Sequence, residues 1–191
     1  AYNYPLGVDR PLEPGEVDVF AGYDVGKKRH PSHLAVFARR QQSEDPEDYV
    51  LYPIHQSFHD GVDYEVQAEM LIEVIKDLKI SRLYVDNSRA EMDERGLPRE
   101  ARLVTLSART KKEAAGALSQ VVSLKRIKFF DEARYLSQLL SVNQSLQAPE
   151  TAMGHGDSFF STMLAVYAHH EAWNFVGLSS VNLADALSGG S

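Results

Sequence analysis

Three aspartates are each expected at the end of a rigid element, and this shared placement points to metal chemistry. Asp24 closes the apolar run VDVFAGYDVG, Asp86 closes LYVD, and Asp157 follows a Gly-His-Gly stretch and opens the last apolar segment. Mg²⁺ and Mn²⁺ take hard oxygen ligands, often from a few carboxylates plus waters and phosphate oxygens. Carboxylates that converge without a cation repel one another. The three side chains therefore predict a site for two ions about 4 Å apart, which could clamp both reacting oxygens of a phosphodiester.

Each aspartate also has a simpler explanation when it is taken alone. Asp24 and the glycine that follows it suit a turn. An acid in the first turn of a helix is favoured by capping and by the helix dipole, which suits Asp157. A metal site is predicted because all three aspartates occur together, each at the end of an element.

The elements that position these acids can be read from hydrophobic periodicity. Three strands, at 17–24, 34–37 and 49–58, are separated by short turns and predict an antiparallel meander, with Pro53 favouring an edge or a bulge. A helical stripe over 62–78, with Asp60 or Asp63 as a possible cap, leads to a strand ending at Asp86, which predicts a crossover with parallel pairing. The remaining expected elements are a strand within 101–108, a helix over 110–124, an extended segment at 125–130, a helix over 131–146 with Asp131 as a possible cap, and a final helix over 157–173.

Length and composition favour one α/β domain. The chain has 191 residues, is 43% hydrophobic and has no cysteine, which excludes a disulfide framework and a thiolate metal site. No apolar run is long enough to span a bilayer, so no membrane partner is expected. The proline-rich residues 1–16 read as a linker, as if the domain were cut from a longer protein, and 17–175 as the domain. Residues 176–191 read as a loosely ordered tail.

The net charge of −7 argues against a surface coated for nucleic acid, but basic groups occur locally. An acidic protein can still bind a polyanion where bases flank acids that hold metal ions. An ordinary solvated face remains the alternative for each group. His155, close to Asp157, could orient a water or a phosphate. The candidate DNA contacts are Lys27, Lys28 and Arg29, just past Asp24, together with Arg109, Lys111 and Lys112.

Two further patterns suggest other kinds of site, a phosphate-binding loop and a zinc site, and neither is favoured. Gly26-Lys27 suggests a phosphate loop, but position 21 is alanine, position 28 is lysine and a strand follows, so the pattern fails. His30 and His33 flank a proline turn and could bind zinc. Without cysteines, such a pair is more often on the surface.

The order of elements resembles the ribonuclease H-like superfamily, a mixed sheet with an antiparallel meander and parallel strands flanked by helices. Three local motifs are similar to those of the nuclease domain of the large terminase subunit of tailed bacteriophages. These are GYDVGKKRHPSHLAVFAR for the first acidic motif, LYVDNS for the second and GHGDSFFSTMLAVYA for the third, the most specific of the three. The resemblance covers roughly residues 17–173.

This resemblance implies a metal-dependent endonuclease that cuts concatemeric double-stranded viral DNA during packaging in the host cytoplasm. It implies that Asp24 bridges two Mg²⁺ or Mn²⁺ ions, with Asp86 and Asp157 holding one each. It also implies a terminase ATPase domain, a small terminase subunit and a portal as partners. Some family members add a fourth acid, for which Asp93, Glu94 or neither could serve.

Other functions remain open alongside this one. A resolvase or transposase-type nuclease would share the fold, although such enzymes are commonly more basic and fit GHGDSFF less well. The actin and sugar-kinase fold also opens with Asp-x-Gly and a meander, but it needs a second domain. A non-catalytic module that binds DNA or a packaging partner would lack a working metal cluster.

Overall fold

The computed structural model describes residues 16–26, 31–88, 92, 94–148 and 155–188. Five strands form one mixed sheet in the order β3-β2-β1-β4-β5. β1 is antiparallel to β2, and β2 to β3, whereas β1 is parallel to β4 and β4 to β5. The predicted meander and crossover are both confirmed. The strands are β1 Glu16–Asp24, β2 Ser32–Gln41, β3 Tyr49–His59, β4 Arg82–Asp86 and β5 Ala101–Val104.

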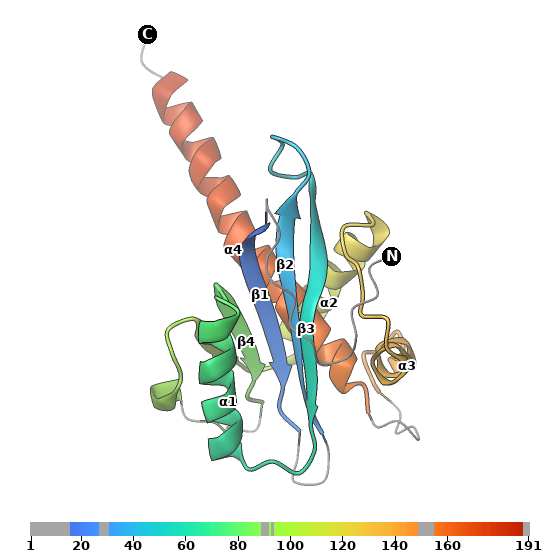
Figure 1. Cartoon of the computed structure of the whole chain (residues 1–191). Helices are drawn as coiled ribbons and strands as arrows, with labels where there is room; N and C mark the ends of the chain where they lie inside the picture. Colours follow the sequence, from blue (N-terminus) through green and yellow to red (C-terminus); the bar gives the residue numbers. More distant parts are fainter. Residues whose placement is uncertain (1–15, 27–30, 89–91, 93, 149–154, 189–191) are drawn as a thin grey trace.

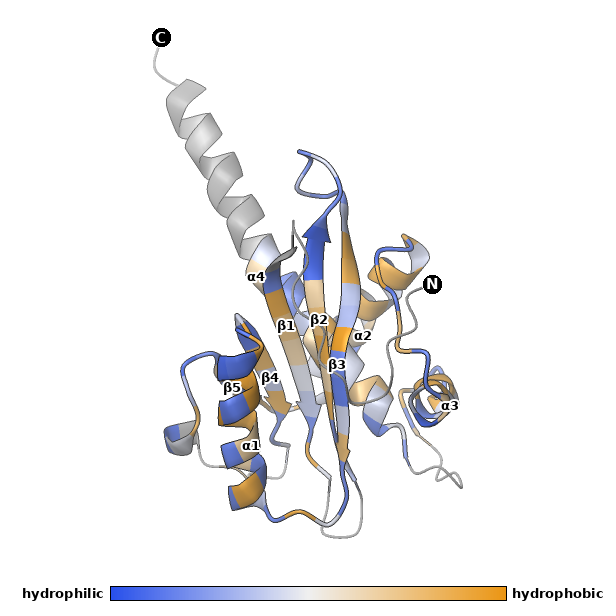
Figure 2. Ribbon diagram, viewed as in Figure 1, coloured by the Kyte–Doolittle hydropathy of each residue, from blue (hydrophilic) through white to orange (hydrophobic). Residues whose placement is uncertain are grey.

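Helices cover both faces of the sheet (Figure 1). On one face, α1 (Tyr64–Asp77) buries Leu71 and Ile75 against the alternate residues Val19 and Ala21 of β1. Figure 2 shows the stripe of apolar residues along α1 that this packing uses. The other face carries α2 (Ala108–Ser123), α3 (Ala133–Ser141) and α4 (Asp157–Ser188). Its core includes Phe20. Because strand side chains alternate, even-numbered β1 residues face α4.

The outer strand β3 carries the irregularity that its proline predicts. Opposite Val36 and Phe37, the register of β3 skips from His55 to Pro53 and leaves Ile54 unpaired. β3 lies at the edge of the sheet, where a missing N–H is tolerated. The expected extended segment 125–130 is reduced to a single parallel bridge between Ile127 and Leu51.

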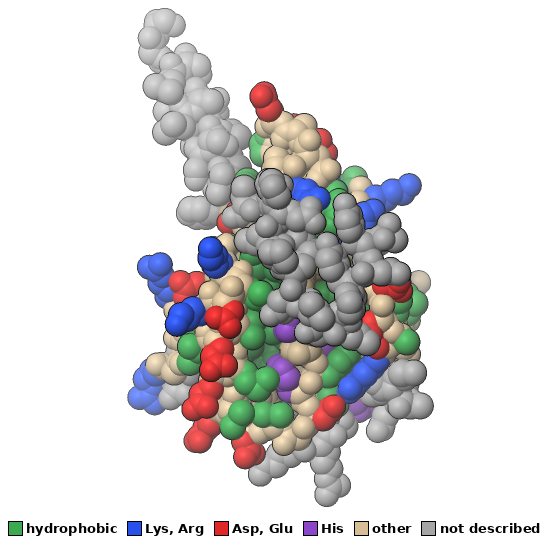
Figure 3. All heavy atoms as spheres, viewed as in Figure 1, with side chains coloured by type: hydrophobic (Ala, Val, Ile, Leu, Met, Phe, Trp, Pro, Cys, Tyr) green, Lys and Arg blue, Asp and Glu red, His purple; other side chains and the backbone are tan. Residues whose placement is uncertain are grey.

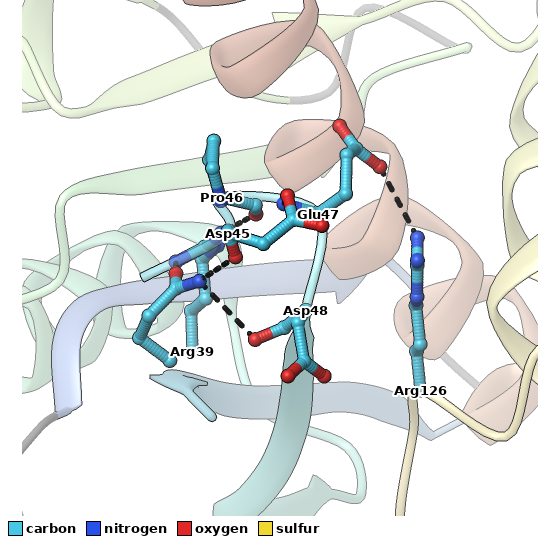
Figure 4. A network of polar contacts seen from close by, with 7 residues as sticks. Arg39, Asp45, Pro46, Glu47, Asp48 and Arg126 are labelled. Carbon is cyan, nitrogen blue, oxygen red and sulfur yellow. Dashed lines mark hydrogen bonds and ion pairs between the residues drawn. The ribbon is translucent and has the colours of Figure 1, made fainter. Parts of the chain in front are cut away.

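The tip of the β2–β3 hairpin is tied down by two arginines (Figure 4). Arg39 donates to the carbonyl oxygen of Pro46, and Arg126 forms an ion pair of 3.2 Å with Glu47. The Arg39 guanidinium also lies 3.7 Å from the ring centroid of Trp173 on α4. Arg39 therefore contacts both the hairpin and the middle of α4, in a region remote from the three aspartates.

Three helix boundaries differ clearly from the sequence predictions, and one of them is the end of α3, at Ser141 and not at residue 146. α3 is capped by Glu132 and not by Asp131, because the Glu132 carboxylate accepts from the N–H groups of Arg134 and Tyr135. α4 continues past the predicted end at residue 173 to Ser188. Asp63 is the N-cap of α1 as predicted, although its side chain makes no capping bond. None of the helices in the described ranges is both long and apolar enough to cross a bilayer.

Candidate metal centre at the carboxyl end of the sheet

Asp24 and Asp86 end two neighbouring parallel strands. The last paired residues of β1 and β4 are Tyr23 and Val85, so the two aspartates are the next residues on each strand. Tyr84 belongs to the core on the α4 face, and alternation places Asp86 on that same face. Asp24 shares its face with Phe20 and therefore also looks toward α4. Both carboxylates are partly buried.

α4 runs antiparallel to β1, and this direction brings its first turn toward Asp24. The ring of Phe20 lies 5.1 Å from that of His169. Two residues along β1, Gly22 lies against the backbone of Ser161 and Ala165. Two strand residues span about 6.6 Å and one helical turn rises 5.4 Å. Two more residues along β1 lead from Gly22 to Asp24, and one more turn towards the start of α4 leads from Ser161 to Asp157. Asp24 therefore lies at the level of the turn that begins at Asp157.

Asp157 is the buried member of the three. It is 6% exposed, and its Oδ2 atom has no hydrogen-bond partner in the part of the chain that the structure describes. Burial raises the pKa of this carboxyl to about 6, against the smaller lowering effects of His155 and Arg134. An unpaired oxygen on a buried carboxylate is costly unless a cation or a proton compensates it. The side chain therefore fits a cation ligand.

The turn after β4 fixes Asp86. Its Oδ1 atom accepts from the backbone N–H of Ser88 at 2.9 Å and from the Ser88 hydroxyl. The same hydroxyl oxygen accepts from the N–H of Leu106, at the approach to α2. Ser107 then caps α2 by accepting from the N–H of Thr110. The positive end of the α2 dipole is thus held beside Asp86.

The first turn of α4 is clamped by α3. Ser158 donates through its N–H to the side chain of Gln138 at 3.1 Å and through its hydroxyl to the carbonyl oxygen of Tyr135 at 2.8 Å. The Tyr135 hydroxyl lies 2.8 Å from that of Thr162. These buried bonds fix the start of α4 relative to the sheet, and the position of Asp157 with it.

The three aspartates share one end and one face of the sheet. However, across residues 16–26, 31–88, 92, 94–148 and 155–188, no three His, Asp or Glu side chains lie close enough together to hold an ion. The ligand set therefore stays a prediction. Its chemistry fits Mg²⁺ or Mn²⁺, because it consists of carboxylate oxygens, one of them buried and unpaired. Of the possible fourth acids, Asp93 lies outside the described residues and Glu94 opens a short 3₁₀ helix, Glu94–Gly96.

The predicted DNA contacts divide into three cases. Lys27, Lys28 and Arg29 lie outside the described residues. Arg109 forms an ion pair of 2.8 Å with Glu113, so its charge is partly compensated. Lys111 and Lys112 lie in the first turns of α2, and the Lys111 ammonium is 5.4 Å from the ring centroid of Phe160 on α4. Both lysines are therefore near the end of the sheet that carries the aspartates. His155 is partly buried, and its charge lowers the pKa of Asp157.

His33 is the residue that the sequence interpretation placed wrongly. It was expected on the surface, yet it is fully buried, directly opposite Asp24 in the β1–β2 pairing. Its ring nitrogens lie 2.6 Å from the Ser161 hydroxyl and 2.9 Å from the Gln56 side-chain oxygen. Burial lowers its pKa to about 3, so the ring is neutral. The alternation from Phe37 back along β2 points His33 inward and could have revealed it. His30 lies outside the described residues.

Arg134 and Asp60 form an ion pair that the sequence did not predict. Their ion pair measures 3.1 Å, and the Arg134 guanidinium also stacks 3.8 Å from the ring centroid of Phe58. Arg134 lowers the pKa of Asp157, whereas Asp60 raises it. The pair therefore modulates the field around Asp157. The two residues are distant in sequence, so no local pattern predicts that they pair.

Comparison with solved structures identifies related folds. The large terminase nuclease of thermophilic phage G20c, with bound magnesium, superposes with a TM-score of 0.59 at 17% identity over 86% of this chain and 92% of that one. The same nuclease with bound zinc matches at 14% identity over 84% of this chain and 91% of that one, with a TM-score of 0.58. The nuclease domain from Thermus phage P74-26 matches at 18% identity over 78% of this chain and 77% of that one, with a TM-score of 0.57.

The large terminase of bacteriophage HK97 matches at 13% identity with a TM-score of 0.53, over 84% of this chain and 40% of that one. No protein-family model and no curated protein matches the sequence. At these identities the likeness is one of fold. The chain therefore has the ribonuclease H-like fold that phage large terminase nucleases share.

Proposed function

We propose that this chain is a metal-dependent endonuclease that cleaves double-stranded DNA during packaging of a phage genome. The observation that carries the proposal is the buried, unpaired carboxylate oxygen of Asp157 at the end of the sheet where β1 and β4 finish in Asp24 and Asp86. The fold likeness to terminase nucleases supports the class of reaction. The G20c nuclease binds magnesium, which supports a divalent cation here.

In this proposal Asp24, Asp86 and Asp157 hold two Mg²⁺ or Mn²⁺ ions. The bound ions supply activation of a water and stabilisation of the leaving 3′ oxygen. Asp157 must lose its proton to serve as a ligand, and with a pKa of about 6 it does so near neutral pH. Lys111 and Lys112 neutralise backbone phosphates near the cut. These residues bind phosphates and not base edges, so sequence preference should be weak.

The assembly around the domain is also part of the proposal. We propose as partners a terminase ATPase domain, a small terminase subunit and a portal, with the enzyme acting in the host cytoplasm. We keep two alternatives, a resolvase or transposase-type nuclease of the same fold and a non-catalytic module that binds DNA or a packaging partner. Both are separated from the proposal by the experiment below.

The decisive experiment is cleavage of a supercoiled plasmid in Mn²⁺, Mg²⁺ or chelator. Wild-type protein should nick and linearise the plasmid in metal, without preferred sites, and Asp24→Asn should abolish cleavage. Asp18→Asn is the matched control, because Asp18 lies on the same strand at its other end and accepts a hydrogen bond from Ser81 that asparagine can keep. Asp18→Asn should cleave like wild type.

Other results point to the alternatives. Resolution of a four-way junction in preference to plasmid would favour the resolvase. If no divalent ion supports cleavage and calorimetry detects no ion binding, the non-catalytic module stands. Ion binding that Asp24→Asn removes, without cleavage, would instead mean that the nuclease waits for its ATPase partner.

A further inference from the structure

The amino ends of β4 and β5 carry a groove that the predicted site does not use. We propose that this groove, the arginine groove, binds the phosphodiester backbone of DNA as a second contact, remote from the cut. It is a cavity of about 540 Å³. The proposal rests on the proposed function for the identity of its polyanion. The groove is lined by Ile80, Ser81, Arg82, Tyr84, Arg99, Glu100 and Arg102.

The groove lies on the same strand and face as Asp86. Arg82 and Asp86 are four residues apart on β4, and alternation places both on the α4 face with Tyr84 between them. Tyr84 pairs with Arg102 of β5, so Arg102 shares that face. Four strand residues span about 13 Å. α4 covers β4 between these two positions, where Tyr84 is only 1% exposed, so DNA would reach the groove as a contact separate from the cut.

The charges of the groove suit phosphates. Three guanidinium groups line it, and three carboxylates bond to its residues, since Arg99 pairs with Glu100 at 3.0 Å, Arg102 pairs with Glu171 at 3.4 Å, and Ser81 donates to Asp18 at 3.2 Å. Guanidinium groups bind phosphate in a bidentate fashion that an ammonium cannot reproduce. In a chain of net charge −7, such a concentration of arginines on one edge is a local exception. Figure 3 shows basic side chains at the left-hand margin, beside the acidic column on α1.

The two ion pairs leave the arginines available to a ligand. The side chains of Arg99 and Arg102 are 93% and 65% exposed. Exposed pairs of this kind contribute little stability, so a phosphate oxygen can replace the carboxylate at small cost. Glu171 has a second donor in the Tyr84 hydroxyl, which keeps its charge compensated when Arg102 turns away. The groove can therefore exchange partners without disturbing the core.

The test is the salt dependence of DNA binding in chelator, where no cleavage occurs. Affinity for a fluorescent 30-base-pair duplex is measured by anisotropy from 50 to 200 mM NaCl. Replacing one phosphate-contacting arginine should make the slope of log K against log[salt] shallower by about 0.9 and weaken binding roughly five- to tenfold at 0.1 M. We expect this for Arg99→Gln and for Arg82→Gln. Arg126→Gln, whose arginine pairs with Glu47 at the hairpin, is the matched control and should not change the slope.

The outcomes separate this proposal from the proposed function. Shallower slopes in both groove variants support the groove even if the plasmid assay shows no cleavage. Slopes equal to wild type in Arg99→Gln, an exposed position where misfolding is not expected, overturn it even if metal-dependent cleavage is present. An equal loss of slope in Arg126→Gln, or no measurable binding of duplex by wild-type protein, also overturns it. In those cases the groove is not a contact for DNA.

Discussion

Gly22 of β1 lies so close to Ser161 of α4 that a Cβ at Gly22 would approach the Ser161 carbonyl oxygen to 1.9 Å. The backbone N of Ala165 would be 2.5 Å away. Neither atom belongs to a side chain that could rotate aside. Gly22 is thus the position that lets α4 lie directly on β1. The same contact sets how far the first turn of α4 stands from Asp24.

Gly22→Ala should therefore destabilise the fold by at least about 1–3 kcal/mol, the usual cost of overpacking a core. Gly116→Ala is the matched control, because a Cβ at Gly116 meets no atom within 4 Å and lies inside α2. Alanine there should stabilise by about 0.5–1 kcal/mol. Urea denaturation measures both free energies of unfolding. Equal stability of the two variants would show that α4 is not packed on β1 as described.

Asp157→Asn should raise stability at neutral pH in metal-free buffer. The folded-state pKa of about 6 lies above the unfolded value near 3.8, so the folded protein holds the proton more tightly. The contribution of Asp157 to the free energy of unfolding is therefore largest below about pH 4. It falls as the pH rises toward 6 and stays lower above that pH. The loss is on the order of 3 kcal/mol. Asparagine carries no charge and should remove that pH dependence.

Two comparisons check this prediction in urea titrations between pH 4 and 7. Asp63→Asn, at an N-cap whose side chain makes no capping bond, is the matched control for the replacement of an aspartate by asparagine at a helix start. Addition of Mn²⁺ should stabilise wild type at pH 7 but not Asp157→Asn, by preferential binding to the folded state. Equal slopes of the free energy of unfolding against pH in wild type and Asp157→Asn between pH 4 and 6 would contradict the raised pKa, because the opposite contributions of His33 and His169 are common to both proteins.

His33 should contribute to acid unfolding with the opposite sign. Its folded-state pKa of about 3 lies below the unfolded value of 6.5, so the unfolded chain takes up the proton first. Stability is then full above about pH 6.5 and falls as pH drops toward 3. His33→Gln keeps a polar group near Gln56 but cannot titrate. The proton uptake on unfolding near pH 5 should fall by about one relative to wild type.

The acid dependence is measured as the slope of the free energy of unfolding against pH. His170→Gln, in a partly buried position of α4, is the matched control for the replacement of a histidine by glutamine. His169, also buried with a pKa lowered to about 3, should behave like His33. A slope that His33→Gln does not alter would mean that this ring is protonated in the folded protein.

Lys111→Gln with Lys112→Gln should weaken DNA binding more than Arg109→Gln does. The ion pair with Glu113 already compensates part of the Arg109 charge, whereas the two lysines lie near the proposed cut. Each lost phosphate contact should reduce the magnitude of the salt slope by about 0.9. Mobility-shift titrations at two salt concentrations measure the difference. A larger loss in Arg109→Gln would place the DNA on the outer face of α2 instead.

The sequence by itself determined the local elements and the ends of strands. Period-two runs predicted β1, β2 and β3, Pro53 predicted the bulge beside Ile54, and the order strand-helix-strand predicted parallel pairing of β1 with β4. These follow from side-chain alternation and backbone chemistry, which act over a few residues. The positions of Asp24, Asp86 and Asp157 at element ends were predictable for the same reason.

The tertiary structure alone decided which faces meet and what they bury. His33 is buried because Ser161 and Gln56, distant in sequence, supply partners for both ring nitrogens. Gly22 is required because the α4 backbone lies against it, which no pattern within β1 reveals. The raised pKa of Asp157 likewise comes from burial. Such effects depend on contacts between distant segments, because desolvation and packing act through space and not along the chain.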